Sequence, residues 1–311
     1  MVKKVLRPGT ITTIELWLKQ AKTEIDSLDA ELILVNVLQH KVMRENELSI
    51  EYLHTAGDAL ELELPSKIDR SFLFAHGDYN LPKEYVKIAD QMVAMRKKQV
   101  PLAYLIDTKE FYGRNFYVTK DTLIPRPESE TIIELAVEEA KTWDKDSRFK
   151  HTILDVGTGS GCLAITMALE VPEAYVIASD ISPKALEVAK ANAERLDAEV
   201  DFYESDLLKN LKLEQAPDIL IANLPYVDPA WEWTSPELTY EPELALYAKN
   251  GGLDLIYKLL AQIMERWQSE KKTHVLLLEA DPIQHKKIIG EAVSRGFDFV
   301  KQDNFILEFK Y

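Results

Sequence analysis

Apolar positions recur at helical spacing through the first third of the chain. Between residues 12 and 99, apolar side chains fall three or four positions apart in the stretches 14–21, 28–38 and 85–100. This spacing is typical of helices that bury one face. Pro82 is expected to open the third helix, where its missing N–H costs nothing, and Pro101 to close it, because a residue before proline avoids helical backbone angles. The pattern predicts a helical domain over residues 1–100.

The period changes after residue 100. Aromatic and apolar residues around Gly113 predict a short hairpin within a linker of residues 101–127, whose proline-rich tail is not expected to form regular structure. From residue 128 to 311, strand-like and helix-like stretches alternate, which indicates an α/β domain with a mostly parallel sheet covered on both faces. The strands are expected at 152–156, 175–180, 200–203, 219–222 and 275–279, the helices at 161–169, 183–196 and 253–267, and a terminal antiparallel pair at 297–300 and 305–309.

Composition narrows the range of partners. The 311 residues, 46% of them hydrophobic, are enough for two domains. Lysine and arginine total 37 against 52 acidic residues, for a formal charge of -15, which disfavours nucleic acid because that partner needs a basic surface. Cys162 is the only cysteine, so no disulfide framework can form within the chain and a cytoplasmic location is expected. No apolar run is long enough for a signal peptide or a membrane span, and the six histidines lack metal-ligand spacing, so neither a membrane nor a metal is expected.

A glycine-rich turn follows the first predicted strand of the second domain. Strand 153–156 runs into Gly157-Thr158-Gly159-Ser160-Gly161 and then into an apolar helix. Glycines at this place let a ligand lie against bare backbone, with N–H groups of the helix facing it. The turn predicts a site that binds a ligand containing a nucleoside. Taken alone, it would suit a dinucleotide cofactor almost as well as any other such ligand.

Three aspartates near this turn are candidate ligand-binding residues. Asp155 could order the glycine turn and face a ligand's ammonium group, while Asp180, at the end of the next strand, could accept hydrogen bonds from both ribose hydroxyls. Asp206, followed by Leu207, is placed to accept an adenine amino hydrogen. Other interpretations stay open. Asp155 could cap the following turn, Asp180 could cap the helix after Ser182, and Asp206 could be a solvated loop residue.

The motif Asn223-Leu224-Pro225-Tyr226 follows a buried strand and lies at the carboxyl edge of the predicted sheet, where ligands bind in open sheets. An amide nitrogen is a poor nucleophile because its lone pair is delocalised into the carbonyl. The side-chain oxygen of Asn223 and the backbone carbonyl of Leu224 could each accept one N–H and so aim that lone pair at a sulfonium methyl group. Pro225 would stiffen the turn, and Tyr226 would stack on the planar acceptor. An ordinary exit from a strand is the alternative.

Several motifs along the chain carry a family resemblance. They are Leu28-Asp-Ala-Glu-Leu-Ile-Leu34, Pro101-Leu-Ala-Tyr-Leu105, Glu110-Phe-Tyr-Gly113, Leu123-Ile-Pro-Arg-Pro-Glu128, Ile153 to Gly161, Asn223 to Tyr226, and Tyr240-Glu-Pro-Glu-Leu-Ala-Leu246. Together they resemble the HemK family, the release factor glutamine N(5)-methyltransferases, over most of the chain.

The resemblance has implications for fold, cofactor and substrate. It implies a Rossmann-like S-adenosylmethionine-dependent methyltransferase domain, with a mostly parallel seven-stranded sheet whose last strand is antiparallel, after a small helical domain that helps seat the substrate. It implies S-adenosylmethionine as cofactor, bound by residues that match Gly157 to Gly161, Asp180 and Asn223. The implied substrate is the glutamine in the Gly-Gly-Gln loop of a peptide chain release factor.

Two features depart from the family pattern. The family usually has Asn-Pro-Pro-Tyr, whereas Leu224 replaces the first proline here, and Asn-Leu-Pro-Tyr also resembles the motif of ribosomal RNA adenine dimethyltransferases. The segment 42–66 is longer than the family's helical domain needs, and residues 60–64 within it alternate like a strand or a surface helix turn. The alternative functions are N(6) methylation of adenine in DNA or RNA and a catalytically impaired binding protein of the same fold. A dehydrogenase fits least.

Two further sites near these motifs have more than one interpretation. Arg126 could hold a substrate backbone or the cofactor-side loop, or it could form a structural ion pair with Glu128 or Glu130. Trp231 and Trp233 could form part of a substrate lid or pack their loop down. The chain is expected to act as a monomer.

Overall fold

The computed structural model describes residues 12–47, 68–144, 150–232, 235–268 and 274–311. Contacts between residues divide the chain into two units, Met1–Ile106 and Asp107–Tyr311. The possible strand at 60–64 and Trp233 lie outside the described residues. Among the helices that are described, none combines the length and the apolar character needed to cross a bilayer.

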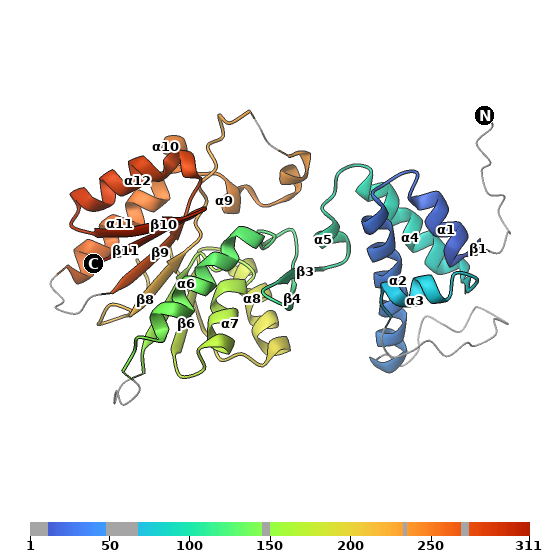
Figure 1. Cartoon of the computed structure of the whole chain (residues 1–311), viewed down its shortest axis with the longest axis horizontal. Coiled ribbons are helices and arrows are strands. Elements are labelled where there is room, and N and C mark those ends of the chain that lie inside the picture. The colour runs from blue at the N-terminus through green and yellow to red at the C-terminus, as the bar shows by residue number, and fades with distance from the viewer. Residues whose placement is uncertain (1–11, 48–67, 145–149, 233–234, 269–273) are drawn as a thin grey trace. The chain divides into compact units, whose positions relative to one another are not determined.

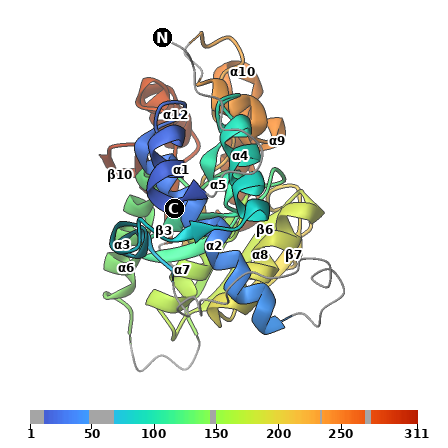
Figure 2. The same ribbon diagram turned by 90° about the vertical axis from the view of Figure 1, so that its right-hand side faces the viewer.

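Helices build the first unit, shown toward the blue end of the colour scale in Figure 1. They are α1 (Ile14–Ala21), α2 (Ser27–Glu47), α3 (Arg70–Ala75), α4 (Lys83–Arg96) and α5 (Leu102–Leu105), with a short antiparallel pair of β1 (Thr12–Thr13) and β2 (Asn80–Leu81). α1 begins at Ile14 because the Thr13 side chain accepts the N–H of Leu16 and so caps the helix. The helices α1, α2 and α4 pack side by side (Figure 2) around a shared apolar core.

The three predicted helices of this unit are confirmed, but the end of the third was predicted wrongly. α4 ends at Arg96 rather than next to Pro101. Its last turn closes at Lys97, and the chain then reverses at Gln99, whose φ of +68° is left-handed. Pro101 instead caps the start of α5. α3 and α5 were not predicted, because six and four residues are too few to establish a helical period.

The predicted hairpin opens the second unit. β3 (Thr108–Phe111) pairs antiparallel with β4 (Arg114–Tyr117), and Phe111 faces Arg114 across a turn of two residues. Those residues, Tyr112 and Gly113, have φ of +50° and +71°. Two successive positive φ values match the right-handed twist of the flanking strands, which is why glycine stands in this turn.

The remaining strands form a seven-stranded sheet in the order β10-β11-β9-β8-β5-β6-β7. They are β5 (Thr152–Val156), β6 (Tyr175–Asp180), β7 (Asp201–Glu204), β8 (Ile219–Ala222), β9 (Val275–Glu279), β10 (Asp298–Asp303) and β11 (Ile306–Lys310). The pairs among β5 to β9 are parallel, and β11 runs antiparallel to both β9 and β10. The predicted α/β fold, with its antiparallel last strand, is confirmed.

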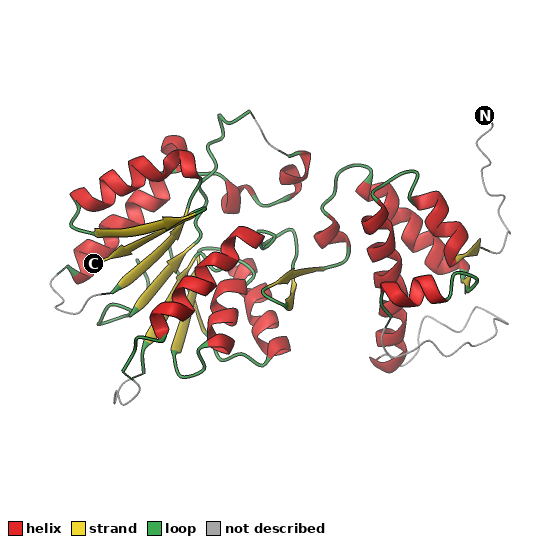
Figure 3. Ribbon diagram, viewed as in Figure 1, coloured by secondary structure: helices red, strands yellow, loops and turns green. Residues whose placement is uncertain are grey.

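Helices cover both faces of this sheet, as Figures 1 and 3 show. α11 (Asp254–Trp267) and α12 (Pro282–Ser294) pack on one face. α6 (Glu130–Ala140), α7 (Cys162–Glu170) and α8 (Pro183–Leu196) pack on the other. Along β5, Leu154 and Val156 face the first layer and Ile153 faces the second, as expected for a strand buried on both sides.

Short helical elements lie in the loops of the second unit. They are the 3-10 helices η1 (Pro127–Ser129) and η2 (Pro236–Tyr240) and the helices α9 (Glu243–Leu246) and α10 (Lys249–Gly252). β5 and β8 are neighbours at the centre of the sheet. The glycine turn and the Asn223 motif therefore leave the same edge of the sheet side by side.

Candidate functional site

The glycine turn lies between β5 and α7 and has the backbone conformation that glycine allows. Gly157, Gly159 and Gly161 have φ of +80°, +55° and +83°. A Cβ on Gly161 would lie 2.8 Å from Cδ1 of Ile165, so this position also requires glycine for packing. A Cβ on Gly159 would meet nothing within 4 Å, which leaves the backbone there open to a ligand.

Asn192 holds the hairpin and the glycine turn together. This α8 side chain is fully buried, and its Nδ2 donates to the backbone carbonyls of Tyr117 at 2.8 Å and of Ser160 at 2.9 Å. Its Oδ1 accepts the N–H of Tyr117 at 2.7 Å. Nothing in the sequence pattern singled out Asn192, because the contacts it makes are 75 and 32 residues away.

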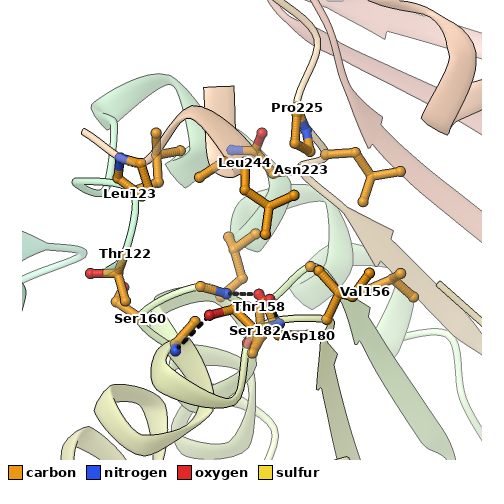
Figure 4. A pocket seen from close by; sticks show the side chains of 18 of the residues that line it. Thr122, Leu123, Val156, Thr158, Ser160, Asp180, Ser182, Asn223, Pro225 and Leu244 are labelled. Carbon is orange, nitrogen blue, oxygen red and sulfur yellow. Dashed lines mark hydrogen bonds between the residues drawn. The ribbon is translucent and has the colours of Figure 1, made fainter. Parts of the chain in front are cut away.

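A pocket opens at the carboxyl ends of β5, β6 and β8, with an empty volume of about 1090 Å³ that includes space open to solvent. Figure 4 shows Thr158 and Asp180 on one side of it and Asn223, Pro225 and Leu244 on the other. Ligand sites occur at this edge in open α/β sheets. Of the predicted site residues, the following line it: Arg126, Gly157, Thr158, Gly159, Ser160, Asp180, Asp206, Leu207, Asn223, Leu224 and Pro225. Asp155, Gly161 and Tyr226 are not among its lining residues.

Asp180 joins the glycine turn to the end of β6. Its Oδ2 accepts the N–H of Gly159 and its Oδ1 accepts the N–H of Ser182, both at 2.9 Å. Burial raises the pKa of this carboxyl, and the backbone donors act in the opposite direction. The alternative that Asp180 caps α8 is wrong, because the Ser182 side chain accepts the N–H of Ala185 and is the cap. A backbone N–H of Ile181 also acts on this carboxylate, which has about four lone-pair sites in all and so can still accept from a ligand hydroxyl.

Asp155 stands behind the turn, in the core. It is fully buried, and its Oδ2 accepts the Thr158 hydroxyl at 2.7 Å, so it orders the glycine turn. Burial raises the pKa of this carboxyl to about 7. Its contact with a ligand's ammonium group stays a prediction, because the side chain does not line the pocket.

Asp206 lines the pocket and is already paired. Both of its carboxylate oxygens accept from Nζ of Lys258 at 2.7 Å. Leu207 beside it is buried and has φ of +53°, which turns the chain along the pocket wall. The adenine contact stays a prediction for Asp206.

The Asn223 motif forms the opposite wall. Nδ2 of Asn223 donates to Oγ of Ser129 at 3.0 Å. The Leu224 side chain is 3% exposed and belongs to the core, and a Cβ on Gly157 would lie 3.0 Å from its Cδ2. Leu224 therefore holds the Asn223 motif in place by packing on the glycine turn. The proline that the family usually has at this position would stiffen the motif through its ring instead.

Tyr226 points away from the pocket lining. Its hydroxyl donates to Oε1 of Glu279 at 3.3 Å, and its backbone carbonyl accepts from Nε2 of Gln284 at 2.8 Å. Burial raises the pKa of Tyr226, and the neighbouring Glu279 adds to that effect. Stacking of Tyr226 on a planar acceptor stays a prediction.

Arg126 lines the pocket and forms an ion pair with Glu241. Glu241 is 5% exposed and also accepts the N–H of Ile124 at 3.0 Å. The predicted ion pair of Arg126 with Glu128 or Glu130 is therefore wrong. Glu130 accepts the N–H of Tyr112 at 2.9 Å, and Glu128 is exposed, where water screens its charge, so the buried carboxylate 115 residues away pairs with the guanidinium.

Ser129 and Glu279 are site residues that the sequence did not reveal. Ser129 is 2% exposed and donates to Oε2 of Glu279 at 2.6 Å, and Glu279 is 1% exposed at the end of β9. Burial raises the pKa of Glu279 to about 7, and hydrogen bonds from the side chains of Ser129, Tyr226 and Asn223 act in the opposite direction. The only available signal was an acid ending an otherwise apolar buried strand.

The family model described as "Methyltransferase small domain" matches residues 140–235, a stretch that contains the glycine turn and the Asn223 motif. Among solved structures, the 16S rRNA N2 G1207 methyltransferase of T. Thermophilus, in complex with AdoMet and guanosine, aligns at 15% identity and a TM-score of 0.45, over 65% of this chain and 48% of that one. The sheet order and the matched family model define a Rossmann-like methyltransferase.

Relatives of higher identity narrow the class. The chain is 38% identical over 222 residues to the release factor glutamine methyltransferase of Koribacter versatilis (strain Ellin345), covering 69% of this chain and 76% of that one. It is 35% identical over 246 residues to the protein of the same name from Neisseria gonorrhoeae (strain ATCC 700825 / FA 1090), covering 77% and 85%. The chain belongs to the release factor glutamine methyltransferase family.

Proposed function

We propose that this protein transfers a methyl group from S-adenosylmethionine to the side-chain amide nitrogen of the glutamine in the Gly-Gly-Gln loop of a peptide chain release factor. The observation that carries the proposal is the orientation of Asn223. Its Nδ2 is bound to Ser129, so its Oδ1 is the atom left to accept an N–H at the pocket wall. Family membership supplies the substrate.

The pocket suits S-adenosylmethionine, which supplies an electrophilic methyl group when bound. The open backbone at Gly159 and the N-terminus of α7 accommodate polar groups of a nucleoside, and Asp180 offers lone pairs to its ribose hydroxyls. Asp206 and Leu207 line the same pocket, and the proposal assigns the adenine edge to them.

Asn223 and Leu224 bind and orient the acceptor nitrogen. The Asn223 Oδ1 and the Leu224 backbone carbonyl each accept one N–H of the glutamine amide, which draws electron density onto the nitrogen and fixes its lone pair toward the methyl group. As the N–CH3 bond forms, the S–CH3 bond of the sulfonium would break and leave a neutral thioether, and the nitrogen would lose one of its two protons to water. That proton becomes acidic only once the new bond forms, so no strong base is required.

Charge favours a protein substrate over adenine in DNA or RNA. An enzyme that extrudes a base still has to neutralise a phosphate backbone, and the formal charge here is -15. The helical unit then contributes to seating the release factor, with Arg126 in the lining of the pocket. A cytoplasmic monomer fits the single cysteine and the soluble translation factor as substrate.

Transfer of labelled methyl groups tests the proposal. The full chain is incubated with radiolabelled S-adenosylmethionine and, separately, a release factor, its variant with alanine for the loop glutamine, and duplex DNA. The proposal expects label in the unaltered release factor only. Label in DNA, or equal label in both release factors, would reject it.

A further inference from the structure

A chain of buried hydrogen bonds leads from Asn223 away from the pocket. Asn223 Nδ2 donates to Ser129 Oγ at 3.0 Å, Ser129 Oγ donates to Glu279 Oε2 at 2.6 Å, and the Tyr226 hydroxyl donates to Glu279 Oε1 at 3.3 Å. Ser129 and Glu279 are at least 98% buried. The chain links η1 to the ends of β8 and β9, which are neighbours in the sheet.

The direction of these bonds decides which end of the Asn223 amide faces the acceptor. An asparagine amide has nearly the same shape when its oxygen and nitrogen are exchanged, so shape alone does not orient it. An ionised Glu279 carboxylate can only accept, so it takes the Ser129 hydroxyl proton, and Oγ therefore meets Asn223 with its lone pairs. Only the NH2 end of the amide can bind such an acceptor, and the oxygen is left for the substrate.

The opposite orientation of the Asn223 amide would prevent it from binding the N–H groups of the substrate amide. With Nδ2 turned to the pocket, Asn223 would present donors to the N–H groups of the substrate amide, and its oxygen would face the lone pairs of Ser129. Both contacts are repulsive, and they leave buried polar groups unpaired.

We propose that Ser129 and Glu279 are positioning residues for methyl transfer, which fix the Asn223 amide with its oxygen toward the acceptor nitrogen. This inference rests on the proposed function for its effect on rate. The orientation of the amide itself does not depend on which substrate is used.

A double-mutant cycle tests the effect on rate. The single-turnover methyl-transfer rate to the release factor is measured for Ser129→Ala, Asn223→Ala and the double variant. The inference expects Ser129→Ala to slow transfer at least about tenfold in the native background but less than about twofold when Asn223 is already alanine. KM for the release factor and the Kd of S-adenosylmethionine should change far less than kcat.

Two variants control for a general loss of structure. Ser129→Thr keeps the hydroxyl and should restore most of the rate. Ser294→Ala removes an exposed serine hydroxyl at the end of α12 and should leave the rate unchanged. Additive effects of Ser129→Ala and Asn223→Ala, or a native rate in Ser129→Ala, would overturn the inference.

A second measurement works without any substrate. In protein labelled with ¹⁵N at asparagine, the side-chain NH2 signal of Asn223 is identified by its loss in Asn223→Ala. Its hydrogen exchange should be slow in the native protein and in Ser129→Thr, and at least about tenfold faster in Ser129→Ala. Equal exchange in all three would overturn the orientation. If exchange behaves as expected while the native enzyme does not label the release factor, the proposed function fails and the orientation stands.

Discussion

Replacing Gly252 with alanine tests how tightly the acceptor motif is held. Gly252 has φ of +81°, and a Cβ there would lie 1.9 Å from the backbone oxygen of Tyr226 and 2.5 Å from Nε2 of Gln284. Gly251 beside it has φ of +68°, but a Cβ there would meet nothing closer than Asp228 Oδ2 at 3.8 Å. Gly251→Ala is therefore a matched control with the same backbone strain and no clash.

The magnitudes follow from these contacts. Alanine in left-handed conformation costs about 1–2 kcal/mol, and Gly251→Ala should cost only that. Gly252→Ala also displaces the Tyr226 carbonyl from Gln284, and a buried group that loses its hydrogen bond costs about 1–3 kcal/mol more. Because real contacts of Cβ are not shorter than 3.0 Å, the carbonyl must move by about 1 Å, and a misplacement of that size can slow catalysis about 10²-fold.

Urea unfolding and single-turnover methyl transfer measure both effects. Gly252→Ala should lose roughly 2–5 kcal/mol of unfolding free energy in total and most of its activity, whereas Gly251→Ala should keep its activity. Equal losses of stability and rate in the two variants would refute the idea that close backbone contact at Gly252 holds the acceptor motif in place.

Three further changes have defined outcomes. Asp180→Asn removes a charged acceptor, so the Kd of S-adenosylmethionine measured by calorimetry should rise about 10- to 100-fold, and an unchanged Kd would contradict the ribose role. Leu224→Ala empties a buried site against the glycine turn and should lower the unfolding free energy by about 2–5 kcal/mol in urea, whereas a loss under about 1 kcal/mol would mean that Leu224 does not support the turn. In Glu279→Gln the pH dependence of stability should flatten. The folded-state pKa of Glu279, about 7, lies above the unfolded value of 4.5, so the protonated native carboxyl contributes stability that is full below pH 4.5 and is lost as the pH rises toward 7. Urea unfolding curves of native and variant protein that stay parallel across that range would contradict this.

The sheet was predictable because its central strands are buried on both faces. Such strands are short apolar runs, and the predicted bounds of β5, β6, β8 and β9 agree with the structure. The glycine turn was recognisable because left-handed backbone at a strand exit requires glycine. Both signals lie within a few neighbouring residues.

The partners of the site residues were not predictable in the same way. Arg126 pairs with Glu241, and Asn223 meets Ser129 94 residues away. These contacts arise only when the sheet brings distant loops to one edge, and no local period encodes them. The Tyr226 hydroxyl likewise binds Glu279, which lies 53 residues further along the chain and could not be inferred from the residues around Tyr226.

Single-turnover transfer by Asn223→Ala tests the central claim most directly. The product is digested, and mass spectrometry locates the methyl group on the loop glutamine of the release factor. Loss of one oriented hydrogen-bonding group at a transition state costs about 10²–10³ in rate, and the account expects a fall of that size in Asn223→Ala, far larger than any change in the Kd of S-adenosylmethionine. A native rate of glutamine methylation in this variant would contradict the account.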